Sequence, residues 1–318
     1  NILFSNINSK KNTINLDTKN LKNILSNSSV NKFKNRINKF KNKKIQFNID
    51  CLNKTSYRVS IIKINNFNSD YIICVIDNIT EIQKNEKIKN CIYKISESIY
   101  ETNDLQSLYK EIHLSLSEVI NTNNFYISFA DWENQTLSFP YYVDEKDENP
   151  NKRSFENGLT EYVIKKDESL LLNDLSNNDL IVKNKIKIKG TIAQNWLGVP
   201  LKLPNGKIMG MICSQSYNNK DRFNEDDKDI FQYVSNQIAL AIKRKKEDIN
   251  IHKQAHYDQL TGLTNKGLFY DRLDLALHHA KRQDEVIAIM FLDIDDFKFI
   301  NDNYGHNIGD KLLKDIGT

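Results

Sequence analysis

Residues 286–295, VIAIMFLDID, form an unbroken apolar run that ends in acidic side chains. Such a run is typical of a strand that is buried on both faces of a sheet. Asp293 and Asp295 then lie at the carboxyl end of this strand, and their spacing of two residues places both carboxylates on one face. The run therefore predicts a layered domain with carboxylates at one edge of its sheet.

The residues that follow, DFKFINDNYGHNIGDKLL, predict that a helix begins beside these carboxylates. Carboxylate oxygens are hard ligands that suit Mg²⁺, and the free N–H groups at a helix start suit phosphate. Lys298 adds a positive charge for phosphate oxygens. The pattern predicts a site for Mg²⁺ and a triphosphate. The alternative that Asp295 or Asp296 only caps the helix stays open.

The string DQLTGLTNK, followed by FLDIDDFKFINDNYGHNIGDKLL, resembles the first half of a GGDEF domain, the fold of diguanylate cyclases. The resemblance runs from about residue 255 to the end, with Lys266 where the family usually has Arg. It implies a nucleotidyl-cyclase-like domain of ferredoxin-like βαββαβ topology over residues 257–318. It also implies Mg²⁺ as cofactor, with Asp293 and the Ile294 carbonyl as metal ligands.

The same resemblance implies how GTP is bound. The amides of Asp296 and Phe297 would hold phosphates, and Lys298 would contact the terminal phosphate. Asn301 and Asp310 would hydrogen-bond guanine. A carboxylate accepts from the N1–H and N2–H₂ edge of guanine, which adenine cannot match, so the second pairing also makes chemical sense.

The GG(D/E)EF motif of this family is expected beyond Thr318, together with the second metal carboxylate. The catalytic residues are therefore unknown, and residues 1–318 alone are expected to be inactive. These residues do not tell whether that motif is intact, or whether a product-inhibition site or an EAL domain accompanies it. Because the first residue is Asn1 and not Met, we expect the natural protein to begin upstream.

Two amphipathic helical stretches divide the chain. In the first, over about residues 80–100, apolar positions step by four, three and four: Ile88, Ile92, Ile95 and Ile99. In the second, over about residues 226–256, they step by three, four and three: Phe231, Val234, Ile238 and Ala241. This is the spacing of a coiled-coil seam, but a helix packed on its own domain gives it too. We prefer dimer stalks, with residues 86–104 and 246–256 as helical linkers of a homodimer.

Before the first linker, alternating apolar residues over 45–49 and 57–61, then YIICVIDNITE, predict antiparallel strands. Strands that run directly into such a helix resemble the C-terminal half of a PAS domain, over roughly residues 45–85. We assign residues 1–85 to a PAS-like domain whose first strands are expected to be missing.

Between the linkers, residues 105–245 resemble a GAF domain. A helix is followed by the strands FYISF and TLSFPYYV, a short helix GLTEYVIKKDES, and WLGVPLKLPNGKIMGMICSQSY. The last stretch is a hairpin that turns at Asn205-Gly206. The resemblance makes a small-molecule ligand of the GAF or PAS-like domain a candidate partner. The sequence does not identify that ligand.

Composition narrows the class of protein. The net charge of +4 comes mainly from Lys, while Arg, the residue typical of nucleic-acid readout, is scarce, so we predict no nucleic-acid partner. The four Cys are far apart without a CxxC pair, which argues against disulfides and zinc and fits the cytoplasm. No apolar run has membrane-spanning length. An anchor upstream stays open.

Together these patterns predict an α+β multidomain protein in which PAS-like and GAF sensor domains of antiparallel sheets are joined by helical linkers to a truncated GGDEF domain. The expected function is a sensory diguanylate cyclase that makes cyclic di-GMP from two GTP molecules. Two alternatives are a degenerate GGDEF protein that binds GTP without catalysis, and a ligand-sensing scaffold.

Overall fold

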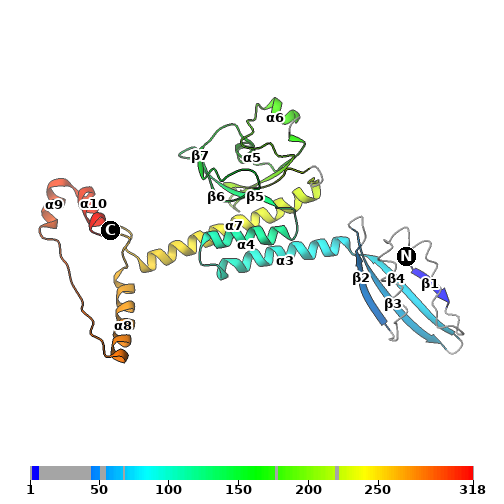
Figure 1. The fold of residues 1–318 in the computed structure, drawn as a ribbon, viewed down its shortest axis with the longest axis horizontal. Coiled ribbons are helices and arrows are strands. Elements are labelled where there is room, and N and C mark those ends of the chain that lie inside the picture. Colours follow the sequence, from blue (N-terminus) through cyan, green and yellow to red (C-terminus); the bar gives the residue numbers. More distant parts are fainter. Residues whose placement is uncertain are drawn as a thin grey trace.

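The computed structural model describes residues 2–6, 44–50, 55–66, 69–175, 178–218 and 222–317. They form an N-terminal sheet, a central domain and a C-terminal group of helices (Figure 1). Helix α3 (Thr80–Glu101) leads from the sheet into the central domain, and helix α7 (Glu225–His256) leads out of it (Figure 1). In the described part of the chain, no helix is long and apolar enough to cross a membrane.

The N-terminal sheet is antiparallel, in the order β1-β4-β3-β2. Its strands are β1 (Ile2–Asn6), β2 (Lys44–Asp50), β3 (Ser56–Asn66) and β4 (Ser69–Asn78). The three strands predicted from alternating residues are confirmed, and Phe47, Val59 and Ile61 are buried. The pairing of β1 with β4 was not predicted. The PAS assignment stays a prediction, and residues 7–43 lie outside the described part.

The central domain is built on an antiparallel sheet in the order β7-β6-β5-β10-β9-β8. Its strands are β5 (Asn124–Asp131), β6 (Thr136–Val143), β7 (Lys152–Ser154), β8 (Leu170–Asn173), β9 (Asn195–Lys202) and β10 (Ile208–Ser216). Helices α3, α4 (Leu105–Ser117) and α7 pack on one face. Helices α5 (Leu159–Lys166) and α6 (Asp179–Lys183) pack on the other.

Alternation along the strands gives this sheet a hydrophobic core on each face. In β5, Phe125 and Ile127 pack against α3, α4 and α7, while Tyr126 between them belongs to the core beneath α5. Successive side chains of a strand point to opposite faces, so one strand supplies both cores. The predicted hairpin is confirmed: Gly206 has a φ of +83° in the turn between β9 and β10.

Helix α3 is part of the central domain. Ile95 and Ile99 are 0% and 7% exposed and belong to the core formed with α4 and α7. Phe231, Val234, Ile238 and Ala241 of α7 are buried in the same core. The expectation that these positions form a seam between two chains is therefore wrong. Intramolecular packing requires the same spacing, because it also covers one face of a helix.

A buried lysine ties α7 to the end of α3. Lys245 is 4% exposed, and its Nζ donates to the carbonyls of Ile99 (2.8 Å) and Thr102 (2.5 Å). The last carbonyls of a helix have no intrahelical donor, and the ammonium group supplies hydrogen bonds to them. Its positive charge also interacts favourably with the negative end of the helix dipole.

We expect Lys245→Met to lower the free energy of unfolding by about 1–3 kcal/mol, because it removes charge-assisted hydrogen bonds to buried carbonyls. Lys243→Met is the matched control, because Lys243 is half-buried and, in the described part of the chain, pairs with Glu247 at 3.5 Å. Its effect should stay within about 0.5 kcal/mol. Urea unfolding of both variants gives the comparison, and equal effects would contradict the role of Lys245.

His113 of α4 is held as a neutral ring in the same core. Its Nε2–H donates to the Thr122 carbonyl at 2.7 Å, so Nδ1 accepts from the Tyr141 hydroxyl at 3.0 Å. The ring also stacks on Phe125 at a centroid distance of 4.8 Å. Burial lowers the pKa of His113 below its ordinary value of 6.5, and the hydrogen bond to Thr122 opposes this only partly.

The lowered pKa makes stability depend on pH. Below pH 6.5 the unfolded chain binds a proton at His113 that the folded chain does not, so the free energy of unfolding should fall as the pH drops from 7.5 to 5.5. His113→Phe should flatten this slope, and His278→Gln, at an exposed ring, should leave it unchanged. Chemical denaturation at several pH values is the measurement. A slope that His113→Phe does not alter would contradict the account.

The C-terminal part contains helices α8 (Lys266–Gln283), α9 (Phe297–Tyr304) and α10 (His306–Ile316). Residues 286–294, predicted as a buried strand, form an extended segment outside any strand, and Val286 and Phe291 are 97% and 88% exposed. A strand needs a neighbour for its N–H and C=O groups, and the described residues place none beside this segment. The strand prediction is therefore wrong here, whereas the helix that it placed after the acids is found.

Candidate functional site

The predicted phosphate-binding residues lie at the start of α9. Asp296 has a left-handed φ of 56° and turns the chain from the extended segment into the helix. It occupies the cap position, but its side chain makes no capping hydrogen bond. The first N–H groups of the helix, including those of Phe297 and Lys298, therefore have no intrahelical acceptor. Together with the Lys298 ammonium group, this helix end can hold phosphate oxygens.

The predicted guanine-binding residues are brought together by the contact between α9 and α10. Gly305, with a φ of +84°, joins the two helices. A Cβ atom at Gly309 would lie 1.9 Å from Asn301 Oδ1, so the helices approach here as closely as only glycine allows. Asn301 therefore lies against the residue that precedes Asp310. Asn301 is half-buried and Asp310 is exposed.

The predicted metal ligands, Asp293 and the Ile294 carbonyl, lie in the extended segment just before α9. The Asp293 side chain is exposed. Both groups offer hard oxygen atoms of the kind that Mg²⁺ binds. In the described ranges, no group of three His, Cys, Asp or Glu side chains is placed to hold a metal ion. The two ligands thus fit Mg²⁺ as part of a site, not as a complete one.

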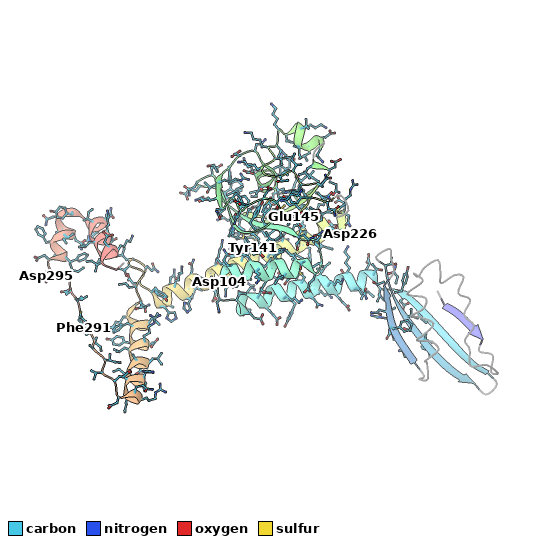
Figure 2. The ribbon with its side chains drawn as sticks, viewed as in Figure 1. Asp104, Tyr141, Glu145, Asp226, Phe291 and Asp295 are labelled. Carbon is cyan, nitrogen blue, oxygen red and sulfur yellow. The ribbon has the colours of Figure 1, made fainter. Side chains whose placement is uncertain are left out.

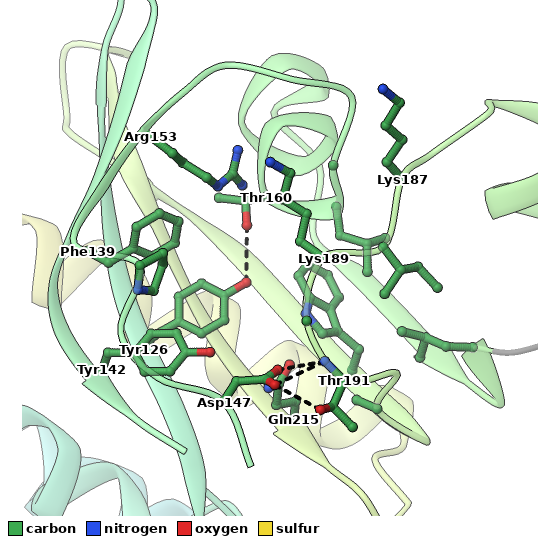
Figure 3. Close-up of a pocket in the computed structure, with 18 of the residues that line it drawn as sticks. Tyr126, Phe139, Tyr142, Asp147, Arg153, Thr160, Lys187, Lys189, Thr191 and Gln215 are labelled. Atoms are coloured by element: carbon green, nitrogen blue, oxygen red, sulfur yellow. Dashed lines mark hydrogen bonds between the residues drawn. The ribbon is translucent and has the colours of Figure 1, made fainter. Parts of the chain in front are cut away.

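A second candidate site is a cavity of about 160 Å³ in the central domain, on the α5 side of the sheet (Figure 3). Four aromatic side chains contribute to its walls: Tyr126, Phe139, Tyr142 and Trp196. Tyr126 and Tyr142 are stacked at a centroid distance of 5.6 Å. The start of α5 and the loop of residues 187–193 form the opposite wall. The cavity can enclose a small ring.

A buried ion pair fixes one side of this cavity. Arg153 Nη1 and Nη2 donate to the carboxylate of Glu161, which is 2% exposed and also accepts from the Glu156 N–H at 2.9 Å. Burial alone would raise the pKa of Glu161, but the hydrogen bonds from Arg153 and Glu156 outweigh it and hold the pKa below its usual range. Glu161 is therefore ionised at neutral pH and keeps Arg153 in place.

The loop of residues 187–193 is fastened over the cavity by side chains. Asp147 accepts from the Thr191 N–H at 2.9 Å and from its hydroxyl at 2.8 Å, as Figure 3 shows. Lys189 pairs with Glu156. Beneath the loop, the Tyr126 hydroxyl lies 3.1 Å from Thr160 Oγ1, and burial raises the pKa of Tyr126 well above its usual value, so the group stays protonated.

Sequence reasoning missed these cavity residues. They come from strands, a helix start and two loops that are far apart in the chain, so no spacing of neighbouring residues identifies them. The one available signal was Glu161, a carboxylate in the first turn of a short helix, next to the apolar residues Leu159 and Val163. If such a carboxylate is buried, it requires a cation nearby.

Figure 2 shows how the two candidate sites are separated. Tyr141 and Glu145 lie in the central domain, the domain that contains the cavity, whereas Asp295 lies at the far end of the extended segment, next to α9 (Figure 2). Helix α7 runs out of the central domain as far as His256, and α8 and the extended segment follow before α9. The structure therefore contains two separate candidate sites, the cavity of the central domain and the residues around the start of α9.

Comparisons with known proteins agree with this division. The family model described as "Diguanylate cyclase, GGDEF domain" matches residues 255–318, and the model described as "GAF domain" matches residues 102–243. Diguanylate cyclase DgcP of Escherichia coli (strain K12) is 26% identical over 243 residues, which are 71% of this chain and 68% of that protein.

Diguanylate cyclase VdcA of Vibrio cholerae is 39% identical over 102 residues, or 30% of this chain and 29% of that protein. The chain thus spans about two thirds of one relative and less than a third of the other. The GAF domain of a Coxiella burnetii phosphoenolpyruvate-protein phosphotransferase matches 52% of this chain and 98% of that one, with 14% identity and a TM-score of 0.43. The chain carries a GAF domain followed by a segment of a GGDEF domain, and it is homologous to diguanylate cyclases.

Proposed function

We propose that this protein is a sensory diguanylate cyclase, which joins two GTP molecules into cyclic di-GMP. The observation that carries the proposal is the helix pair α9–α10. It offers free amides and Lys298 at one end, and Asn301 beside the residue that precedes Asp310 at the contact between the helices. One group of residues is suited to phosphates and the other to a guanine edge.

In the proposed reaction, the 3′-hydroxyl of each GTP attacks the α-phosphate of the other, and pyrophosphate leaves. The amides of Asp296 and Phe297, with Lys298, hold the triphosphate, while Asn301 and Asp310 orient the base. Asp293 and the Ile294 carbonyl would hold Mg²⁺, which would supply charge neutralisation at the phosphates when bound. Because the described residues form only part of a metal site, residues 1–318 alone should not form product.

The proposed reaction requires two protomers, since each holds one GTP. We therefore propose a homodimer in the cytoplasm. Its contact must involve residues other than Ile95 and Ile99, which the chain itself covers. We also propose that the GAF cavity binds a small ligand that modulates the cyclase. A change around that ligand would reach the GGDEF segment through α7.

A second candidate function is a GTP-binding regulator without catalysis. The observation that favours it is the incomplete metal site, since the described residues supply a single acidic ligand, Asp293, at this place. A third, the ligand-sensing scaffold, is favoured by the cavity of the GAF domain, which aromatic side chains help to line. Formation of cyclic di-GMP would distinguish the cyclase from both alternatives.

Guanine recognition can be tested with Asp310→Ala in the full-length protein. The variant loses a charge-assisted hydrogen bond to the base, which contributes roughly 1.5–3 kcal/mol. Affinity for GTP should therefore fall about ten- to a hundred-fold, and the preference for GTP over ATP should weaken with it. Steady-state kinetics with GTP, with ATP as competitor, is the measurement.

Asp302→Ala is the matched control, because Asp302 is an exposed acid next to Asn301 on the same helix. It should change GTP affinity by less than about two-fold. Unchanged GTP affinity and unchanged preference over ATP in Asp310→Ala would show that Asp310 does not contact guanine.

A further inference from the structure

The GAF cavity has polar groups at two opposite ends, and aromatic rings lie between them. Figure 3 shows the side-chain ends of Arg153 and Lys189 on the same side as the Thr160 hydroxyl. Gln215 and Asp147 lie at the other end, and Tyr126 lies between the two groups (Figure 3). A ligand that fills this cavity therefore meets different chemistry at its two ends.

The first end favours an anion. Leu159 and Thr160, the first residues of α5, are 8% and 5% exposed and line the cavity, and their N–H groups have no acceptor within the helix. Arg153 and Lys189 are already paired, with the carboxylates of Glu161 and Glu156. These pairs leave further guanidinium and ammonium donors, so a ligand carboxylate can receive charge-assisted hydrogen bonds without displacing them.

The remaining acids of the cavity wall do not offset this preference. Asp147 already accepts from the N–H and hydroxyl of Thr191 and from the Tyr217 hydroxyl at 3.4 Å. Glu148 is exposed to solvent, which screens its charge. An ammonium ligand would therefore meet no free buried carboxylate in this cavity.

At the second end, an acceptor of the protein receives no hydrogen bond. Gln215 is 9% exposed and lines the cavity. Its Nε2 donates to Asp144 at 2.6 Å and contacts the Tyr217 hydroxyl at 3.0 Å, while its Oε1 has no partner among the described residues. This amide oxygen can accept a hydrogen bond, so a hydroxyl or N–H group of a ligand at this end would be stabilising.

The space between the ends suits a single flat ring. The cavity measures about 160 Å³, and an engineered apolar cavity of roughly 150 Å³ in another protein takes up benzene. Tyr126, Tyr142 and Trp196 provide aromatic surface against which such a ring can pack. A ring with two small substituents fills the available volume, whereas a nucleotide exceeds it.

We propose that this cavity binds a small aromatic carboxylate that carries a hydrogen-bond donor on the side opposite its carboxylate. The carboxylate contacts the start of α5, Arg153 and Lys189, and the donor contacts Gln215 Oε1. This inference rests on the proposed role of the cavity as a ligand site, and it adds the chemical class of the ligand.

The test uses 4-hydroxybenzoate as the probe and the 318-residue chain as the protein. Trp196 lines the cavity, and the only other tryptophan, Trp132, can be replaced by Phe to give a single fluorophore. We expect saturable quenching of Trp196 by 4-hydroxybenzoate. The uncharged 4-hydroxybenzamide should bind about ten-fold more weakly, and so should 4-hydroxybenzylamine, which carries the opposite charge.

Two lysines of the same loop provide matched variants. Lys189 is exposed, so Lys189→Gln should weaken 4-hydroxybenzoate binding by about three- to five-fold. Lys187 extends away from Arg153 and Thr160 (Figure 3), so Lys187→Gln should change binding by less than about two-fold. Circular dichroism confirms that both variants are folded.

Three outcomes would overturn the proposal: no saturable quenching by 4-hydroxybenzoate, equal or tighter binding of the amide or the amine, or equal effects of the two lysine variants. The measurement contains no nucleotide. Its failure therefore leaves the proposed cyclase reaction untouched, and a failed cyclase assay leaves the binding result standing.

Discussion

Ile95→Asp is expected to destabilise the central domain by at least about 3–5 kcal/mol, because it leaves an uncompensated charge in the core between α3, α4 and α7. Ile95 is 0% exposed, and the polar group nearest in sequence within that core, Ser98, already donates to the Ile95 carbonyl. The carboxylate would be shielded from water, and the buried ammonium group of Lys245 is already bound to the carbonyls of Ile99 and Thr102. Thermal unfolding followed by circular dichroism should show a much lower midpoint, or no cooperative transition.

Ile82→Asp provides the control on the same helix. Ile82 is 49% exposed and lies in the first turn of α3, where an acidic side chain also interacts favourably with the helix dipole. The midpoint should stay close to that of the unsubstituted protein. If Ile95→Asp instead left the midpoint unchanged and converted a dimer into a monomer, Ile95 would belong to a seam between two chains.

Asp293→Ala in the full-length protein should lower the rate of cyclic di-GMP formation by on the order of 10²–10³-fold. In the proposed mechanism this carboxylate is the acidic ligand of Mg²⁺, so its loss would remove charge neutralisation at the phosphates. Saturating GTP should not restore the rate, whereas a large excess of Mg²⁺ should restore a small part. Steady-state kinetics at several Mg²⁺ concentrations is the measurement.

Asp274→Ala is the control for this variant. Asp274 is an exposed acid on α8 that contacts only His278 in the described part of the chain, so its removal changes the net charge equally without touching the site. Its rate should match that of the unsubstituted protein. An Asp293→Ala variant that kept full activity would exclude Asp293 as a metal ligand.

Local signals allowed correct prediction of the elements that depend on neighbouring residues. Asn205 and Gly206 supply the turn of the β9–β10 hairpin, and Gly206 adopts the expected positive φ. The structure adds a local feature that was not predicted: Asn224 and Asp227 cap α7 reciprocally, each side chain accepting from the other residue's N–H at 2.9 Å. The conformation of such elements depends on a few neighbouring residues, so the local sequence is sufficient to predict it.

Elements that depend on distant partners were harder to predict. The spacing of Ile95 and Ile99 requires a covered face, but it does not say whether α7 of the same chain or a second chain covers it. The run from Val286 has the composition of a buried strand, yet no described strand lies beside it. The GAF cavity joins Arg153 and Glu161 to residues of other strands and loops, and no single spacing encodes that arrangement.

The proposed reaction is tested most directly by incubating the full-length protein with GTP and Mg²⁺ and separating the products by chromatography. The account predicts cyclic di-GMP and pyrophosphate from the unsubstituted protein, and on the order of a hundred-fold less of both, or lower, from Asp293→Ala. GTP binding without any cyclic di-GMP would contradict the cyclase assignment and favour the regulator. Equal product from both proteins would contradict the metal site on which the proposed mechanism depends.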